Sequence, residues 1–145
     1  MLKVQEEKMG RLTVDLVVAN NQDVQMAEGG AISADKIRQT QLQGVVDTGA
    51  ACLVIPKATA DQLGLKPSGE VTVPYADRRT AQRLLVEEVR AELMGRHGTF
   101  KAVVEPDRTT ARIGAIVLED LDLLVDCQKQ TLRPRDPGGY VAELE

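Results

Sequence analysis

The chain has 145 residues, a net charge of -4 and a sequence pI of about 5.1, and 43% of its residues are hydrophobic. This length fits one ordinary domain with a sizeable core, and the hydrophobic fraction argues against disorder. Without a long basic run to neutralise phosphates, and with only 2% aromatic residues to stack on bases, no nucleic-acid partner is expected. Apolar runs such as 123–125 are far too short to span a bilayer, so no membrane association is expected either.

The N-terminal residues 1–10 are charged and include no apolar secretory segment. We interpret them as a loose leader of a cytoplasmic protein. In that compartment a disulfide between Cys52 and Cys127 is not the default, and we expect both cysteines to be small buried hydrophobes beside apolar runs. Because the chain has a single histidine, His97, no Cys/His zinc site is predicted, and no cofactor is expected.

The first half of the chain alternates short apolar segments with turns. Apolar residues recur at every second position from residue 12 to 18, which is typical of a half-buried strand. Gly64 is well placed to end a helix as its C-terminal cap. In chain order we predict a strand over 11–18, a surface loop over 20–37, strands over 39–46 and 52–55, and a helix over 57–63.

The second half has the same pattern of many short strands and regular turns. A shift in the alternation at Glu87-Glu88 indicates a β-bulge. We predict strands over 71–73, 82–93, 100–104, 123–126 and 131–133, turns over 75–79 and 95–98, and a short helix that ends near Leu121. This pattern predicts a small, closed, barrel-like all-β domain with one or two short helices over residues 11–135, and an irregular tail over 136–145.

The segment Asp47-Thr48-Gly49-Ala50 has the clearest chemical meaning. An apolar strand delivers a carboxylate to a tight turn, where the Thr48 hydroxyl can hold neighbouring backbone. Gly49 permits a close backbone approach or an unusual backbone angle. Asp-Thr-Gly alone is a weak signal, because Asp and Gly form turns for purely local reasons. The segments around it therefore decide its interpretation.

Together these segments resemble the retropepsin-like aspartic protease family, in particular its bacterial single-lobe members, over roughly residues 10–135. The stretch 46–50 resembles the catalytic turn of the family, and 53–56 with the helix after it resembles the next segment. Ile113-Gly114 resembles the closing turn behind the site. The residues that resemble the flap are Tyr75, Ala76, Asp77, Arg78 and Arg79.

The resemblance implies an acid-protease lobe that is completed by homodimerisation, since family members use two aspartates and this chain has one Asp-Thr-Gly. Asp47 would be the catalytic acid of each subunit, with Thr48, Gly49 and Ala50 supporting its turn. Two such carboxylates share one proton, and the ionised one activates a water that attacks the peptide carbonyl. The substrate would be an extended peptide or protein segment lying beneath two flaps.

Three positions depart from the family pattern. Ala51 replaces a polar residue, the turn 77–79 lacks the usual glycine, and Arg112 replaces the leucine before the closing Ile-Gly pair. One alternative is therefore a catalytically weak or inactive module that keeps the fold for dimerisation or peptide binding. Another is a structural β-domain in which Asp47 only caps a turn. We interpret Arg78-Arg79 as exposed loop charge in preference to a contact for an acidic substrate.

Overall fold

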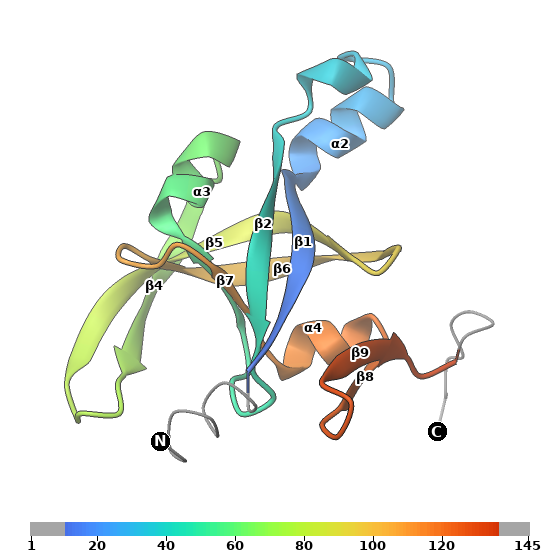
Figure 1. Ribbon diagram of the computed structural model, residues 1–145. Helices are drawn as coiled ribbons and strands as arrows, with labels where there is room; N and C mark the ends of the chain where they lie inside the picture. The colour runs from blue at the N-terminus through green and yellow to red at the C-terminus, as the bar shows by residue number, and fades with distance from the viewer. Residues whose placement is uncertain (1–10, 137–145) are drawn as a thin grey trace, which may run out of the picture.

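The computed structural model describes residues 11–136, which form mostly strands with a few short helices (Figure 1). None of the helices in this range is long and apolar enough to cross a membrane. The strands are β1 (Leu12–Asn20), β2 (Gln39–Val46), β3 (Leu53–Pro56), β4 (Pro67–Pro74), β5 (Thr80–Leu93), β6 (Arg96–Glu105), β7 (Ala111–Ile113), β8 (Leu123–Asp126) and β9 (Thr131–Pro134). The helices are α2 (Asn21–Glu28), the 3-10 turn η1 (Ala34–Lys36), α3 (Lys57–Leu63) and α4 (Ala115–Asp120).

Six of the strands close into a barrel in the order β1-β2-β7-β3-β6-β5, because β5 also pairs with β1. The β2–β7 and β3–β6 pairs are parallel, and the other neighbours are antiparallel. β4 pairs with β5, and the β4–β5 hairpin extends away from the barrel. β8 and β9 form a separate small sheet. The predicted all-β, closed barrel-like fold is confirmed.

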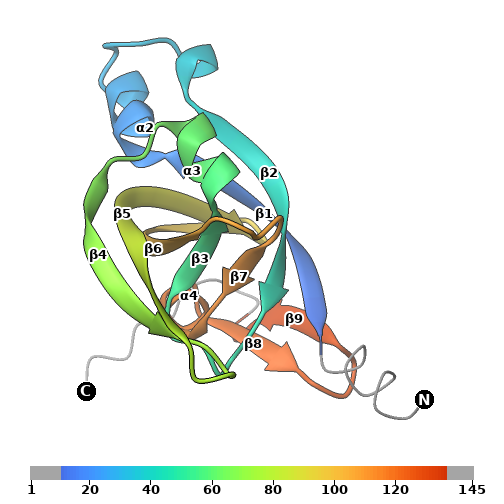
Figure 2. The same cartoon turned by 90° about the vertical axis from the view of Figure 1, so that its left-hand side faces the viewer.

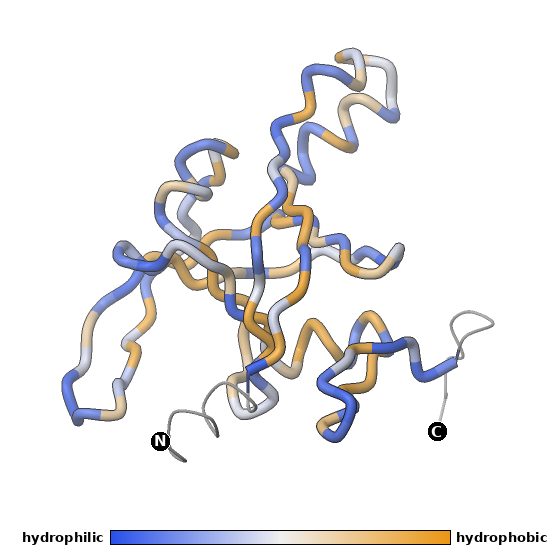
Figure 3. Tube along the Cα trace, in the orientation of Figure 1, coloured by the Kyte–Doolittle hydropathy of each residue, from blue (hydrophilic) through white to orange (hydrophobic). Residues whose placement is uncertain are grey.

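Aliphatic side chains fill the barrel, as a chain with 2% aromatic residues requires. Along β1, Leu16 and Val18 are fully buried, while Asp15 is exposed and Val17 is only partly buried, which matches the predicted period of two. Figure 3 shows apolar residues along the barrel strands and hydrophilic residues at the tip of the β4–β5 hairpin. The largest fully buried side chains include Leu16, Leu53, Ile55, Leu63, Leu93, Ile113 and Leu121.

The turn after β2, the tip of the β4–β5 hairpin and the β8–β9 sheet lie at one end of the barrel (Figures 1 and 2). Helix α2 lies at the opposite end in both views. Strands β2, β7 and β5 therefore direct their connected loops toward a common face, and that face is where the candidate site is built.

The predicted loop over 20–37 is wrong, because it contains α2 and η1. Its polar residues act as caps and ion-pair partners. The Asn20 side-chain oxygen accepts the N–H of Asp23 at 3.1 Å, which caps α2. The buried Asp23 carboxylate then accepts the backbone N–H of Arg38 at 3.0 Å and its Nε at 2.8 Å. A short helix held by polar contacts lacks the apolar periodicity that would predict it.

Other local predictions are confirmed or corrected by the backbone. Helix α3 spans the predicted residues, and Gly64 caps it in the left-handed conformation with φ 62°. The β-bulge lies between Val86 and Val89 as predicted, with Glu88 at φ 60°. The hairpin turn predicted over 95–98 is shorter, since β6 already begins at Arg96.

The prediction that Cys52 and Cys127 are buried is wrong, because both are exposed free thiols. Cys52 lies in the connection between β2 and β3, and Cys127 lies in the turn between β8 and β9. Both adjoin apolar strands in sequence, but turns lie at the surface. The predicted leader over 1–10 and the tail from 137 onward lie outside the described residues.

Acid titration tests the role of Asp23. Its pKa is held below the ordinary value of 3.8, chiefly by side-chain hydrogen bonds from Arg38, although burial opposes this. A carboxyl group with a lowered folded-state pKa stabilises the fold above its unfolded pKa, and that stability is lost as pH falls through the folded value. We expect Asp23→Asn to be less stable than wild type at neutral pH, and the difference to shrink below about pH 4.

Urea unfolding of both proteins across this pH range measures the effect. Asp61→Asn is the matched control, because it removes an exposed carboxylate whose ion pair is with Lys57 on the same helix. A stability difference between Asp23→Asn and wild type that stays constant with pH would contradict this account.

Candidate functional site

Asp47 directly follows β2 and presents its carboxylate at the surface, with the side chain 43% exposed. Its backbone N–H donates to the Ile113 carbonyl at 2.9 Å, which extends the parallel β2–β7 pairing by one residue. Asp47 Oδ1 accepts the N–H of Gly49 at 3.0 Å, and the Asp47 carbonyl accepts the N–H of Ala50 at 3.1 Å. The acid is thus held in a tight turn by backbone donors, with Oδ2 left outside these contacts.

The Ile113-Gly114 segment lies directly behind this turn. The N–H of Ala115 donates to the Ala50 carbonyl at 2.8 Å, and the N–H of Ile116 donates to the Ala51 carbonyl at 3.0 Å. A Cβ atom at Gly114 would lie 2.7 Å from the Ala51 carbonyl carbon and oxygen, so only glycine fits this approach. These backbone bonds support the turn without the polar side chain that Ala51 lacks.

The remaining residues of the Asp47 turn face solvent. Thr48 and Gly49 are exposed and Ala50 is partly buried. Gly49 does not have a positive φ, and a Cβ there would make only an ordinary contact of 3.4 Å with Asp47 Oδ1. The contacts of a single subunit therefore do not explain why position 49 is glycine. The role of Thr48 and Gly49 in supporting the catalytic turn stays a prediction.

The five flap residues form the turn between β4 and β5. The N–H of Tyr75 donates to the Arg79 carbonyl at 2.8 Å, and the N–H of Arg78 donates to the Tyr75 carbonyl at 3.0 Å. Asp77 accepts both the N–H and the Nε of Arg79, at 3.1 and 2.6 Å, and such a side-chain contact to nearby backbone is typical of Asp in turns. Arg78 has φ 70°, a conformation that favours glycine, so the turn forms without one at some backbone cost.

A polar network that includes Tyr75 fixes this hairpin to β6. The Tyr75 hydroxyl donates to Glu105 at 2.7 Å, and Arg83 Nε donates to the same carboxylate at 2.7 Å. The hydrogen bond to Glu105 is also the main reason that the pKa of Tyr75 is raised. Because all three side chains are partly buried, the network anchors the hairpin while its tip at Ala76 and Asp77 stays exposed.

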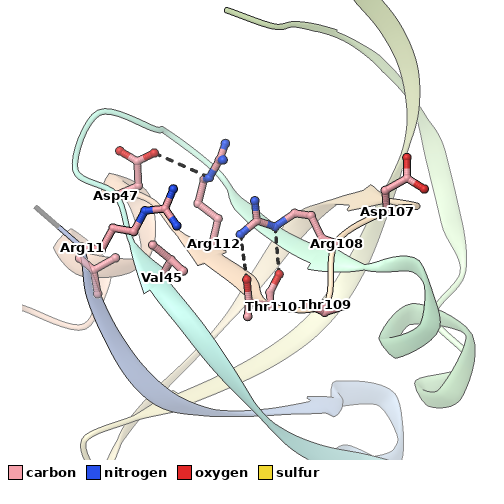
Figure 4. A pocket seen from close by; sticks show the side chains of 9 residues that line it. Arg11, Val45, Asp47, Asp107, Arg108, Thr109, Thr110 and Arg112 are labelled. Atoms are coloured by element: carbon pink, nitrogen blue, oxygen red, sulfur yellow. Dashed lines mark hydrogen bonds and ion pairs between the residues drawn. The ribbon is translucent and has the colours of Figure 1, made fainter. Parts of the chain in front are cut away.

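A pocket of about 540 Å³ adjoins Asp47 (Figure 4). A second pocket of about 280 Å³ lies beside the flap. It shares Asp107, Arg108 and Arg112 with the first pocket. Arg112 Nε lies 3.7 Å from Asp47 Oδ2. The first pocket is lined by Arg11, Val45, Val46, Asp47, Asp107, Arg108, Thr109, Thr110 and Arg112.

Arg11 and Arg108 were not predicted as site residues. Arg11 is next to Leu12, which pairs with Val46, and this register places it beside Asp47. Arg108 lies before β7, which runs parallel to β2. Strand pairing brings both residues to the site, and the sequence pattern alone does not specify that pairing. Among residues 11–136, no group of three or more His, Cys, Asp or Glu side chains is arranged to hold a metal ion.

A family model described as aspartyl protease matches residues 36–125. The chain belongs to this family. The match includes the Asp47 turn, the flap and Gly114, while Arg11 at the start of β1 lies outside the matched range. Membership supports a protease-type function and confirms the family resemblance. No curated protein matches the chain.

Replacement of Gly114 tests the packing behind the turn. Gly114→Ala is expected to destabilise the fold by about 2 kcal/mol or more, because its Cβ meets backbone that cannot move without breaking the bonds to Ala50 and Ala51. Gly69→Ala is the control, since a Cβ there has no atom within 4 Å. Thermal or urea unfolding gives the comparison, and equal stability of the two variants would contradict the close-packing argument.

Proposed function

We propose that this protein is an aspartic endopeptidase that hydrolyses peptide bonds with water activated by Asp47 from two subunits of a homodimer. The observation that supports this most strongly is the position of Asp47. It is an exposed carboxylate held by backbone donors at the end of a barrel strand, in a chain of the aspartyl protease family. The alternative that Asp47 only caps a local turn does not account for the glycine-dependent support behind it.

The second carboxylate is proposed to come from another copy of the chain. Two acids that share a proton must lie within hydrogen-bond reach, about 3 Å apart. Asp107 and Asp126 line pockets with Asp47, but neither is hydrogen-bonded to it within residues 11–136. Asp126 instead accepts the N–H of Lys129 at 3.0 Å in the β8–β9 turn. A two-fold axis beside Thr48 and Gly49 would bring two identical turns together.

In such a dimer the two Asp47 side chains hold one proton between them. The ionised carboxylate takes a proton from a water molecule, and the water oxygen attacks the peptide carbonyl. The protonated carboxyl donates a hydrogen bond to the carbonyl oxygen as it gains negative charge. An extended peptide would lie across the axis, and the two β4–β5 hairpins would cover it and exclude bulk water.

A catalytically weak or inactive peptide-binding dimer is the second candidate, and Arg112 is the observation that favours it. Its guanidinium lies 3.7 Å from Asp47 Oδ2, the oxygen free to meet a partner carboxylate. Both side chains are more than 40% exposed, and ion pairs of that kind contribute little. We therefore expect substrate or the partner subunit to displace the contact, and an active enzyme remains the main proposal.

Asp47→Asn is expected to lower kcat/KM for cleavage of an unfolded protein by at least about 100-fold, because the amide cannot take a proton from water. The variant should keep its circular dichroism spectrum and its self-association. Asp126→Asn is the control, since the turn role of Asp126 predicts retained cleavage. Equal activity of Asp47→Asn and wild type, or an equal loss in Asp126→Asn, would contradict the dyad.

Mixing the two proteins tests whether two copies are required. An excess of Asp47→Asn subunits should lower the activity per wild-type subunit, because exchanged dimers contain only one acid. Catalysis by a single chain predicts no change on mixing. Sedimentation equilibrium of the same samples reports whether subunits associate at the assay concentration.

A further inference from the structure

The pocket beside Asp47 is basic although the whole chain has a net charge of -4. Arg11, Arg108 and Arg112 reach it from three positions in the fold, the start of β1, the loop before β7 and β7 itself. Figure 4 shows their guanidinium groups directed toward the same space, with Asp107 on the far side of Arg108 from Asp47. Positive charge is therefore concentrated where a substrate would contact the enzyme.

These three arginines differ in how they are paired from Arg79 and Arg83, which line the second pocket but not the first. Arg79 is paired with Asp77 at 2.6 Å, and Arg83 is paired with Glu105 at 2.7 Å. Within residues 11–136, Arg11 and Arg108 have no carboxylate within 4 Å, and Arg112 has only the 3.7 Å contact with Asp47. The first pocket thus has more guanidinium groups than carboxylates to neutralise them.

Arg108 is held in position before any ligand arrives. Its Nε donates to the Thr110 carbonyl at 2.9 Å, and its NH2 group donates to Thr110 Oγ1 at 3.1 Å. Burial, followed by the nearby charge of Arg112, lowers the pKa of Arg108. A carboxylate in the pocket would offset both effects, and a fixed guanidinium fork suits carboxylate oxygens.

We infer that this pocket binds an acidic side chain, Asp or Glu, of the peptide substrate through Arg11, Arg108 and Arg112. The inference rests on the proposed peptidase, because it treats the pocket as part of a substrate cleft. Since the pocket adjoins Asp47, the acidic residue would flank the bond that is cleaved. A pocket of about 540 Å³ has room for a Glu side chain with the adjoining backbone.

Matched peptides test this directly. A cleavage site is first mapped by mass spectrometry in an unfolded protein, and peptides are made with Glu or Gln on either side of the cleaved bond. Wild type should cleave the best Glu peptide with a kcat/KM about twofold to fivefold above its Gln counterpart, the size of effect given by partly exposed charge pairs. The ratio should fall toward one at high salt, because these charges are screened.

Single variants then identify the groups responsible. Arg11→Gln, Arg108→Gln and Arg112→Gln should each lower the Glu/Gln ratio, while Arg112→Lys should keep part of it. Of the three variants, Arg11→Gln is expected to disturb the fold least. The Arg11 side chain makes no hydrogen bond to residues 11–136, whereas Arg108 bonds to Thr110 and Arg112 contacts Asp47. Arg133→Gln is the control, because Arg133 is exposed on β9 and lines neither pocket.

The outcomes separate this inference from the proposed activity. Cleavage with equal rates for Glu and Gln peptides would overturn the inference and leave the peptidase intact. Absence of all cleavage would count against the peptidase. The inference would then be decided by the fluorescence anisotropy of labelled extended peptides that differ only in Glu or Gln: tighter binding of the Glu peptide would support it, and equal binding would overturn it. Weakened dimerisation in the arginine variants with an unchanged Glu/Gln ratio would assign the arginines to the subunit interface and overturn the inference.

Discussion

The approach of Gly114 to the backbone of Ala51 and Cys52 is the contact on which the whole site depends. It places β7 beside β2, so that the Ile113 carbonyl receives the N–H of Asp47. The same junction carries Arg112 into the pocket next to Asp47. A glycine behind the turn therefore determines where the acid lies, how it is held and which charges surround it.

The sequence predicts the parts of this protein that follow from local pattern. Alternation of apolar residues gives most strands of the barrel but not the three-residue β7, and Asp47 with its flanking strands gives the acid turn. It does not predict α2, because Asn20 and Asp23 stabilise that helix through polar contacts with distant residues such as Arg38. It also does not predict the arginine pocket, which exists only because strand pairing brings Arg11, Arg108 and Arg112 together.

The departures from the family pattern have different structural consequences. The backbone bonds made by Ala50 and Ala51 support the turn that lacks a polar residue at position 51, so that change leaves the acid well held. The flap turn closes without glycine because Arg78 adopts a left-handed conformation. Arg112 changes the chemistry most, since it adds positive charge beside the acid. In the proposed enzyme Arg112 would serve substrate choice, and a second subunit would supply the other carboxylate.

The distance between the two Asp47 carboxylates in a crystal structure of the assembled protein is the direct test of a shared-proton pair. We expect a two-fold dimer with carboxylate oxygens about 3 Å apart, close enough to share a proton. Crystals of the dimer bound to a peptide analogue would also show whether Arg112 has moved away from Asp47. A dimer in which the two carboxylates are separated by more than about 6 Å, beyond the range of strong charge coupling, would contradict the shared-proton pair.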